Sequence, residues 1–503
     1  MTSLFPATRG SLRRNKSTPF SAFHKPLQPI ALRRTSRSAL AVCALLLTAA
    51  APLCAQQRSN YADYPQKRGD IQPLQWTELP PWMTLGMELR GRTEGNTSYN
   101  YAQNGDRIYE LTRVWGSMEV RPAKFLTGYI QFMDTHALGL PAHVVAANMR
   151  DNFDARQAFL NFHVKPGRVP IQAIAGRQEL KFGSERVIGI SDWTNNSRTF
   201  DGFDLRLGDK NRVDLFSTSV VAIHPYSLDK HGAGLTFHGA YGQITTWIPK
   251  VNLQPYVLLH DVRGVTSQQG TKGNEEETTF GLETSGKLPA NLDYIVNASL
   301  QRGSYANDSI HAGQSFGKVS YSANYLPWKP RLGGEYDYAT GNSHRNPYRI
   351  GTYDQEYPSN HNAFGLFDLF GYQNIRQERL NLDLGPTPNL TFLVQGEFLN
   401  LVNEHDNLYA SGGTTTIKAP TAGFTTDQIG TGFDASGKYV YHNYLVANIG
   451  VGHFFPGALM LANSHGSAQT YAYFSLTYRY RVDKHAVPPP SQGSNKTNAA
   501  STH

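Results

Sequence analysis

The segment "GRQELKFGSERVIGISDWTNNSRTFDG", residues 176–202, concentrates charges of both signs. Carboxylates beside basic groups are what general acid–base catalysis requires. The same mixture also lines aqueous pores and covers solvated loops. The segment therefore poses three alternatives, a catalytic set, a pore lining or a surface loop, and its charged residues are Arg177, Glu179, Lys181, Glu185, Arg186, Asp192, Arg198 and Asp201.

Signatures of catalysis are weak in the rest of the chain. The sequence contains no G-x-S-x-G elbow, no P-loop and no H-E-x-x-H motif. Its 17 His residues are scattered, and several fall in polar segments where a solvated imidazole is the simpler interpretation. We therefore predict no catalytic residue, no metal site and no cofactor. A barrel hydrolase of the phospholipase or protease type is the enzymatic alternative, but no convincing Ser, His and Asp constellation can be assembled for it.

The amino-terminal segment has the character of an export signal. Residues 1–38 carry eight Lys and Arg and no acid, and the apolar run "ALAVCALLLTAAAP" follows at 39–52. This pattern predicts a secretory signal peptide over residues 1–55, with a long basic n-region and cleavage after Ala55. The apolar run is too short for a transmembrane helix, which needs about 20 residues.

Removal of this leader changes what the composition implies. The chain has 47 basic and 39 acidic side chains, and the leader holds eight of the basic ones and no acid, so 39 of each remain. A net charge near zero argues against a nucleic-acid partner. Both cysteines, Cys43 and Cys54, also lie in the leader, so the mature part has none with which to form a disulfide.

Alternating segments and two kinds of connection predict the fold. Short turns with Pro, Gly, Asn or Asp, such as 121–124, 208–211 and 455–458, separate alternating segments of about ten residues, the length of a tilted transmembrane strand. The other connections are long and polar, as in 341–373 and 403–437. Short turns at one end and long loops at the other are typical of an outer-membrane barrel. A soluble β-sandwich or propeller would share the alternation but not this asymmetry.

We therefore predict an all-β fold, a transmembrane antiparallel up-and-down β-barrel of about 18 strands over residues 83–482, with short periplasmic turns and long extracellular loops. An irregular periplasmic lead-in over 56–82 precedes the barrel, and a tail with the composition of disorder over 483–503 follows it. The expected strands are 84–94, 107–120, 125–136, 153–164, 170–182, 200–208, 211–222, 232–247, 254–263, 277–286, 291–303, 315–326, 330–340, 374–384, 389–401, 437–453, 457–463 and 470–482.

Charges should occupy the strand register that avoids lipid, where a midplane Arg or Lys costs about 2–4 kcal/mol. In "LGMELRGR" (85–92), the apolar residues share one face and the charged residues share the other. "FDLRL", "RLGGEYDY" and "IRQERLNLDL" alternate in the same way. The pattern predicts a lumen lined by Arg and carboxylates in near balance. These opposed charges could also satisfy one another inside a plugged barrel.

The charged segment 176–202 then divides into parts. In "RQELKF", Arg177, Glu179 and Lys181 share a face that should point into the lumen, with Leu180 and Phe182 on the other. "GSERVIGISDWTNNSRT" is expected to form an extracellular loop that folds inward and narrows the pore. The candidate pore-lining, substrate-binding residues are Glu88, Arg90, Arg92, Arg113, Arg177, Glu179, Lys181, Arg186, Asp192, Arg198, Asp201, Asp204, Arg206, Glu335, Asp337, Arg376 and Arg379.

Three long blocks of the sequence resemble the alginate export family of outer-membrane proteins. The first is the charged segment 176–202. The second comprises "GGEYDYATGN" and "TYDQEYPSNHNAFGLFDLFGYQNIRQERLNLDLGPTPNLTFLVQGEFLNL". "GHFFPGALM" with "YAYFSLTYRYRV" is similar to the end of the family's proteins. Together the resemblance covers residues 85–482. It implies an 18-strand barrel with an Arg-rich, anion-selective lumen, and the matching positions are Arg177, Glu179, Glu185, Arg186, Asp192, Trp193, Arg198, Asp201, Asp337, Asp368, Asn374 and Arg376.

The sequence thus predicts a bacterial outer-membrane channel that passes an anionic or polar polysaccharide or small solute. The alternatives are a plugged surface-binding or structural barrel and the barrel hydrolase. The expected partners are outer-membrane lipid, a saccharide substrate, the barrel-assembly machinery during insertion and periplasmic secretion components.

Overall fold

The computed structural model describes residues 79–483 apart from 102–104, 362, 443 and 464–465. The predicted signal peptide, nearly all of the lead-in and the predicted tail beyond residue 483 lie outside the described residues. No helix in the described residues is long and apolar enough to cross a membrane.

The described residues form a closed antiparallel barrel of 18 strands, which confirms the predicted fold class. The barrel strands are β1 (Met83–Asn96), β2 (Arg107–Ala123), β3 (Leu126–Leu138), β4 (Asp151–Val164), β5 (Ile171–Gln178), β6 (Phe200–Gly208), β7 (Asn211–Ala222), β9 (Leu235–Ile244), β10 (Val251–Thr266), β11 (Lys272–Leu288), β12 (Leu292–Tyr305), β13 (Asp308–Ser322), β14 (Arg331–Ala339), β16 (Ile375–Thr387), β17 (Leu390–Leu401), β20 (Gln428–Tyr441), β21 (Leu445–Pro456) and β22 (Gln469–Asp483).

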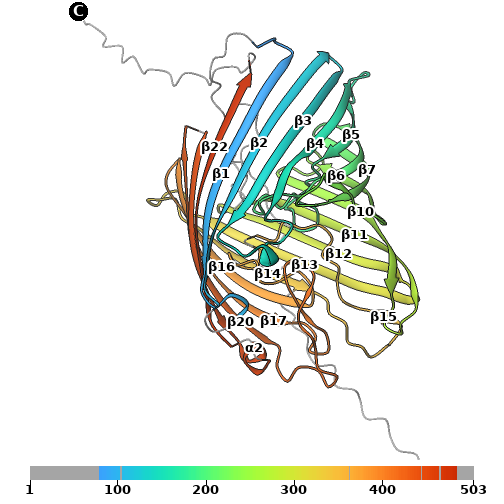
Figure 1. Ribbon diagram of the computed structural model, residues 1–503, viewed down its shortest axis with the longest axis vertical. Coiled ribbons are helices and arrows are strands. Elements are labelled where there is room, and N and C mark those ends of the chain that lie inside the picture. The colour runs from blue at the N-terminus through green and yellow to red at the C-terminus, as the bar shows by residue number, and fades with distance from the viewer. Residues whose placement is uncertain (1–78, 102–104, 362, 443, 464–465, 484–503) are drawn as a thin grey trace, which may run out of the picture. The chain divides into compact units, whose positions relative to one another are not determined.

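Each barrel strand pairs with its neighbour in the chain, and the last strand pairs with the first. β22 lies antiparallel to β1 with Leu89 opposite Tyr478, and Figure 1 shows this closure where the red strand adjoins the blue one. Closure leaves no unpaired edge, which is the condition for a sheet to span a bilayer.

Short elements occupy the long connections. They are η2 (Tyr99–Tyr101), η3 (Ala142–Val144), β8 (Lys230–His231), β15 (Arg349–Ile350), β18 (Leu408–Tyr409), β19 (Thr415–Ile417) and α2 (Ala458–Ala462). The longest connections lie at the end of the barrel opposite the short turns, as the sequence predicts. They follow β5, β14 and β17 over residues 179–199, 340–374 and 402–427.

Several predicted strands differ from the observed ones at their ends, such as the strand expected over 170–182, which ends at Gln178, and one region is wrong in its elements. The single strand expected over 437–453 is two strands, because the chain reverses between Tyr441 and Leu445, where His442 has a positive φ. The strand expected over 457–463 is the helix α2, and "FPGA" (455–458) belongs to the long-loop end rather than to a short turn. Neither Pro nor Gly marks the true reversal, and a single Asn at position 443 is a weak signal of a turn.

The outward register of the strands is apolar, as lipid requires. Phe280 of β11, Leu300 of β12 and Ile449 of β21 are all at least half exposed, while their strand neighbours point inward and are buried or half-buried. Aromatic residues are exposed beside the short turns, which is where an interfacial girdle is expected. They include Trp82, Phe125, Trp247, Tyr325, Trp328, Tyr439 and Tyr441.

The barrel interior contains two large apolar clusters. In one, Leu180 and Phe182 from residues 179–199 pack against inward-facing wall residues such as Phe216 of β7 and Leu258 of β10. In the other, Tyr353, Phe364 and further residues of 340–374 pack against β13, β16 and β17. A barrel this wide could hold an open aqueous channel, so these clusters show that loops occupy much of its cross-section.

Candidate functional site

The inward register of β1 and β2 carries buried charges. Glu88, Arg90 and Arg92 are buried, whereas the intervening Leu89 is exposed on the outer face. Arg113 of β2 lies beside them and donates to the Glu88 carboxylate through Nε at 3.0 Å. This arrangement agrees with the alternation seen in the sequence.

Residues 179–199, called the inward loop below, leave the barrel wall and enter the interior. β5 ends at Gln178, and Leu180 and Phe182 then turn inward and are buried. Phe182 stacks on Tyr241 of β9 with ring centroids 4.5 Å apart. The predicted orientation of this stretch is therefore wrong: apolar contacts draw Leu180 and Phe182 inside, and Lys181 is exposed and pairs with Glu185 at 2.7 Å.

One end of the inward loop is fixed to β1 and β2 by arginines. Arg113 Nη1 lies 3.0 Å from Asp192 Oδ1, and Arg90 Nη1 donates to the Asp192 carbonyl at 2.8 Å. Burial raises the pKa of Asp192, but the guanidinium groups of Arg113 and Arg90 outweigh it and hold that pKa below its usual value. Arg92 Nη1 donates to the Trp193 carbonyl at 2.6 Å. Asp192 is therefore an anionic anchor of the loop.

The middle of the inward loop reaches the far wall. Arg186 is buried and pairs with Glu335 of β14, and its Nη2 lies 3.2 Å from Asp337 Oδ1. Arg379 of β16 also binds Glu335, at 2.5 Å, and Lys318 of β13 lies 3.6 Å from it. The inward loop thus spans the interior from β1 and β2 to β14.

A second loop, residues 340–374, packs against the inward loop. Tyr357 accepts a hydrogen bond from the Gly189 amide at 2.8 Å and donates its own amide to the Val187 carbonyl at 3.0 Å. Arg198 donates to the Tyr357 carbonyl at 2.6 Å, and burial lowers the Arg198 pKa to about 10. Trp193 stacks on His361 with centroids 3.7 Å apart. The two loops therefore form one assembly inside the barrel.

Residues that the family resemblance singled out in the second loop also have structural roles. Asn374 is fully buried and donates through Nδ2 to the carbonyls of Asn403 and Asn407, each at 3.0 Å, which ties this loop to residues 402–427. Asp368 lies 2.9 Å from His361 Nδ1. These contacts position the loops.

The structure places most candidate residues in the interior, but not all. Asp204 and Arg206 of β6 are in the inward register, and Glu179 of the inward loop pairs with buried Arg156 of β4. Besides Lys181, three candidates depart from expectation. Arg177 and Asp201 face each other across β5 and β6 in the register of exposed Ala175 and Phe203, and Arg376 lies in the outward register of β16 beside Asp427.

The reasons for these departures are local. Gly176 and Gly202 have φ of 127° and 154°, a conformation that a side chain would obstruct. They allow the Arg177–Asp201 pair to lie directly beneath the surface segment 223–229. Arg376 alternates with Gln377 and Arg379, which are buried, so the period-2 rule alone excludes it from the lumen.

Several interior charges were missed that the same alternation could have identified. They cluster toward the short turns, and their guanidinium groups are partly exposed to the interior. They include Arg121, Arg212, Arg479 and Arg481, with Arg479 of the "YRYRV" stretch donating to Glu88 at 2.7 Å.

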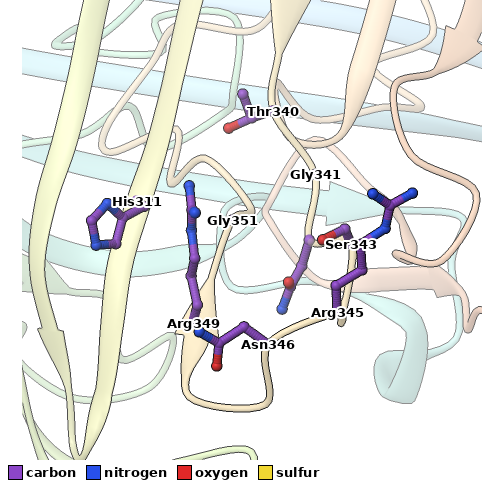
Figure 2. A pocket seen from close by; sticks show the side chains of 9 residues that line it. His311, Thr340, Gly341, Ser343, Arg345, Asn346, Arg349 and Gly351 are labelled. Atoms are coloured by element: carbon purple, nitrogen blue, oxygen red, sulfur yellow. The ribbon is translucent and has the colours of Figure 1, made fainter. Parts of the chain in front are cut away.

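A cavity of about 320 Å³ lies at the long-loop end and is not lined by the inward-facing strand residues. Figure 2 shows Arg349 of β15 between His311 of β13 and Gly351, with Arg345 farther along the same loop. His311 is exposed while its neighbours Ile310 and Ala312 are buried, so this cavity does not belong to the lumen.

Comparisons with known proteins agree with the fold. The family model described as alginate export matches residues 81–474. Among solved structures, the outer membrane protein opdK of Pseudomonas aeruginosa has a TM-score of 0.55 at 10% identity, over 79% of this chain and 98% of that one. Pseudomonas aeruginosa OccK11 (OpdR) has 0.51 at 12%, over 80% and 96%. Acinetobacter baumannii OccAB2 has 0.52 at 9%, over 80% and 100%. No curated protein matches the chain.

Proposed function

This chain belongs to the alginate export family, and on that premise we propose that it is an outer-membrane channel which passes anionic or polar saccharides and related small solutes. The inward Arg, Glu and Asp side chains would form its lining, and the inward loop its constriction. Outer-membrane lipid surrounds the barrel. The barrel-assembly machinery and periplasmic secretion components are proposed as further partners.

The observation that carries the anion preference is the unequal exposure of paired charges near the short turns. The Arg206 side chain is 28% exposed, whereas its partners Asp204 and Asp214 are 0% and 1% exposed. Arg212 is 32% exposed and shares Asp214. Formal charges nearly balance in this wall, but interior water would meet mainly guanidinium groups. A surface of that kind attracts anions.

The inward loop supports a selective rather than a wide pore. It is held at two points by ion pairs, Asp192 with Arg113 and Arg186 with Glu335. A solute would therefore have to pass beside a fixed obstacle. Fixed charges around a narrow passage discriminate between solutes more strongly than charges in a wide one, because little water screens them.

Liposome swelling with purified protein tests this function. Galacturonate, an anionic hexose derivative, should enter faster than galactose, and oligouronates should enter more slowly as their length increases. Vesicles that swell equally in both monosaccharides would contradict the anion preference. Vesicles that swell in neither would contradict the channel function.

A plugged surface-binding barrel is the second candidate function, because the two interior clusters fill so much of the cross-section. It predicts no permeation by the intact protein and saccharide binding that depends on residues 341–373 or 403–437. Permeation that appears only after the inward loop is shortened would favour this candidate over an open channel.

A further inference from the structure

Three aspartates converge at the long-loop end of the barrel, apart from the interior network. Asp151 and Asp154 begin β4, and Asp229 comes from the segment 223–229 that follows β7. Carboxylate oxygens of the three lie within 4.8 Å of one another. Nothing in their sequence spacing indicates a site, because the barrel topology alone brings them together.

The Asp151 carboxylate is buried and has no hydrogen-bond donor beside it among the described residues. Its side chain belongs to a residue that is 0% exposed, and neither of its carboxylate oxygens accepts a hydrogen bond. A buried carboxylate without a partner costs several kcal/mol, so such groups acquire either a proton or a cation. The Asp229 carboxylate faces Asp151, and in its ionised form it supplies neither a proton nor a cation.

The local positive charge is insufficient. Arg177 is engaged with Asp201, to which Nε donates at 2.8 Å and Nη2 at 3.1 Å. It lies 3.7 Å from Asp154 and donates to the main-chain carbonyl of Asp229. One guanidinium therefore contacts two carboxylates, those of Asp201 and Asp154, while the carboxylates of Asp151 and Asp229 lie in the same cluster.

The backbone holds the three aspartates in place. The Asp229 amide donates to the Asp154 carboxylate, and Asp229 Oδ1 accepts the His224 amide at 2.6 Å. The Asn152 amide donates to the Pro225 carbonyl at 3.2 Å, which joins β4 to the same segment. Asp229 is partly exposed, so an ion could enter from solvent.

We propose that Asp151, Asp154 and Asp229 bind one Ca²⁺ ion, which fastens the segment 223–229 to the start of β4. Hard divalent cations prefer carboxylate oxygens, and Ca²⁺ tolerates irregular sites that water and backbone carbonyls complete. Mg²⁺ demands stricter octahedral geometry and keeps more of its own water. The site is independent of what passes through the barrel.

Calorimetric titration of the refolded, EDTA-treated full chain with CaCl2 tests the proposal, with thermal unfolding as a second measurement. The expected result is one Ca²⁺ per chain and a Tm that rises with calcium concentration. Asp151→Asn and Asp229→Asn should each weaken binding at least tenfold. Asp209→Asn, in the exposed turn at the other end of the barrel, is the matched control and should bind as the unaltered chain does.

Three results would overturn the proposal. One is no binding at about 1 mM Ca²⁺, the weak limit of extracellular calcium sites, since Asp151 and Asp229 would then share a proton. The second is unchanged binding in the Asp229→Asn variant, which keeps β4 intact and guards against misfolding of the Asp151 variant. The third is tighter binding of MgCl2 than of CaCl2.

Discussion

The guanidinium of Arg186 lies against the carboxylate of Glu335, although the two belong to opposite walls of the barrel. The loop that carries Arg186 leaves β5, and Glu335 is on β14, with β6, β7, β9, β10, β11, β12 and β13 between them. The charged groups of both signs in residues 176–202 are thus explained in part, because Arg186 tethers this segment across the barrel interior.

Glu335 should be indispensable to this tether. It compensates three buried or nearly buried cations, Arg186, Arg379 and Lys318. Glu335→Gln removes this carboxylate from all three and leaves Asp337 as the carboxylate beside Arg186. The loss of one partner from a buried ion pair costs about 3–5 kcal/mol. Urea unfolding of the folded barrel in detergent measures the change. Glu404→Gln, at an exposed position, is the control and should unfold with the unaltered chain; equal midpoints for both variants would contradict the assigned role.

The second loop should loosen as the pH rises. Burial raises the pKa of Glu356 to about 7, and Asp354 adds to this effect although His260 of β10 opposes it. A carboxyl group whose pKa is raised above its ordinary 4.5 in the docked loop stabilises docking fully when the pH is below 4.5. This stabilisation is lost as the pH rises through about 7.

Hydrogen exchange of residues 351–361, corrected for the intrinsic rate, should therefore be faster at pH 8.5 than at pH 5.5. Glu277 of β11 faces the same group. Glu356→Gln imitates the protonated acid and should remove most of the pH dependence. A variant with the full pH dependence would assign the effect to other groups.

The strand register can be tested on the lipid face of β11. Phe280 is 50% exposed in the outward register, and Glu276 lies four residues along in the same register, toward the long-loop end. Phe280→Arg should destabilise the folded barrel in vesicles by about 2–4 kcal/mol, and Glu276→Arg by about 0–1 kcal/mol. Equal effects would mean that the membrane does not cover β11 as described.

Much of the fold followed from the sequence because a period-2 alternation fixes which face of a strand meets lipid. That rule placed Glu88, Arg90 and Arg206 correctly, and it would also have excluded Arg376. It failed where strands ended. The rule could not show that β5 stops at Gln178, since Leu180 and Phe182 continue the alternation but are drawn inward by Phe216 and Tyr241.

Contacts between loops were beyond sequence reasoning for another reason. The pairs of Arg186 with Glu335 and of Gly189 with Tyr357 join residues about 150 or more positions apart. Loop closure imposes few rules that composition can reveal. The inward folding of residues 183–199 was expected, but their partners were not.

Ion selectivity in planar lipid bilayers tests the central claim most directly. Under a KCl gradient, the reversal potential of the unaltered chain should indicate chloride preference, because the partly exposed Arg206 and Arg212 side chains lie over the buried carboxylates. A unit charge acts with about 1 kcal/mol at 4 Å in water, so Arg206→Gln or Arg212→Gln should lower the anion-to-cation permeability ratio by up to about fivefold. Arg376→Gln, on the outer face, should leave the ratio unchanged. A cation-selective channel, or one indifferent to Arg206 and Arg212, would contradict the account.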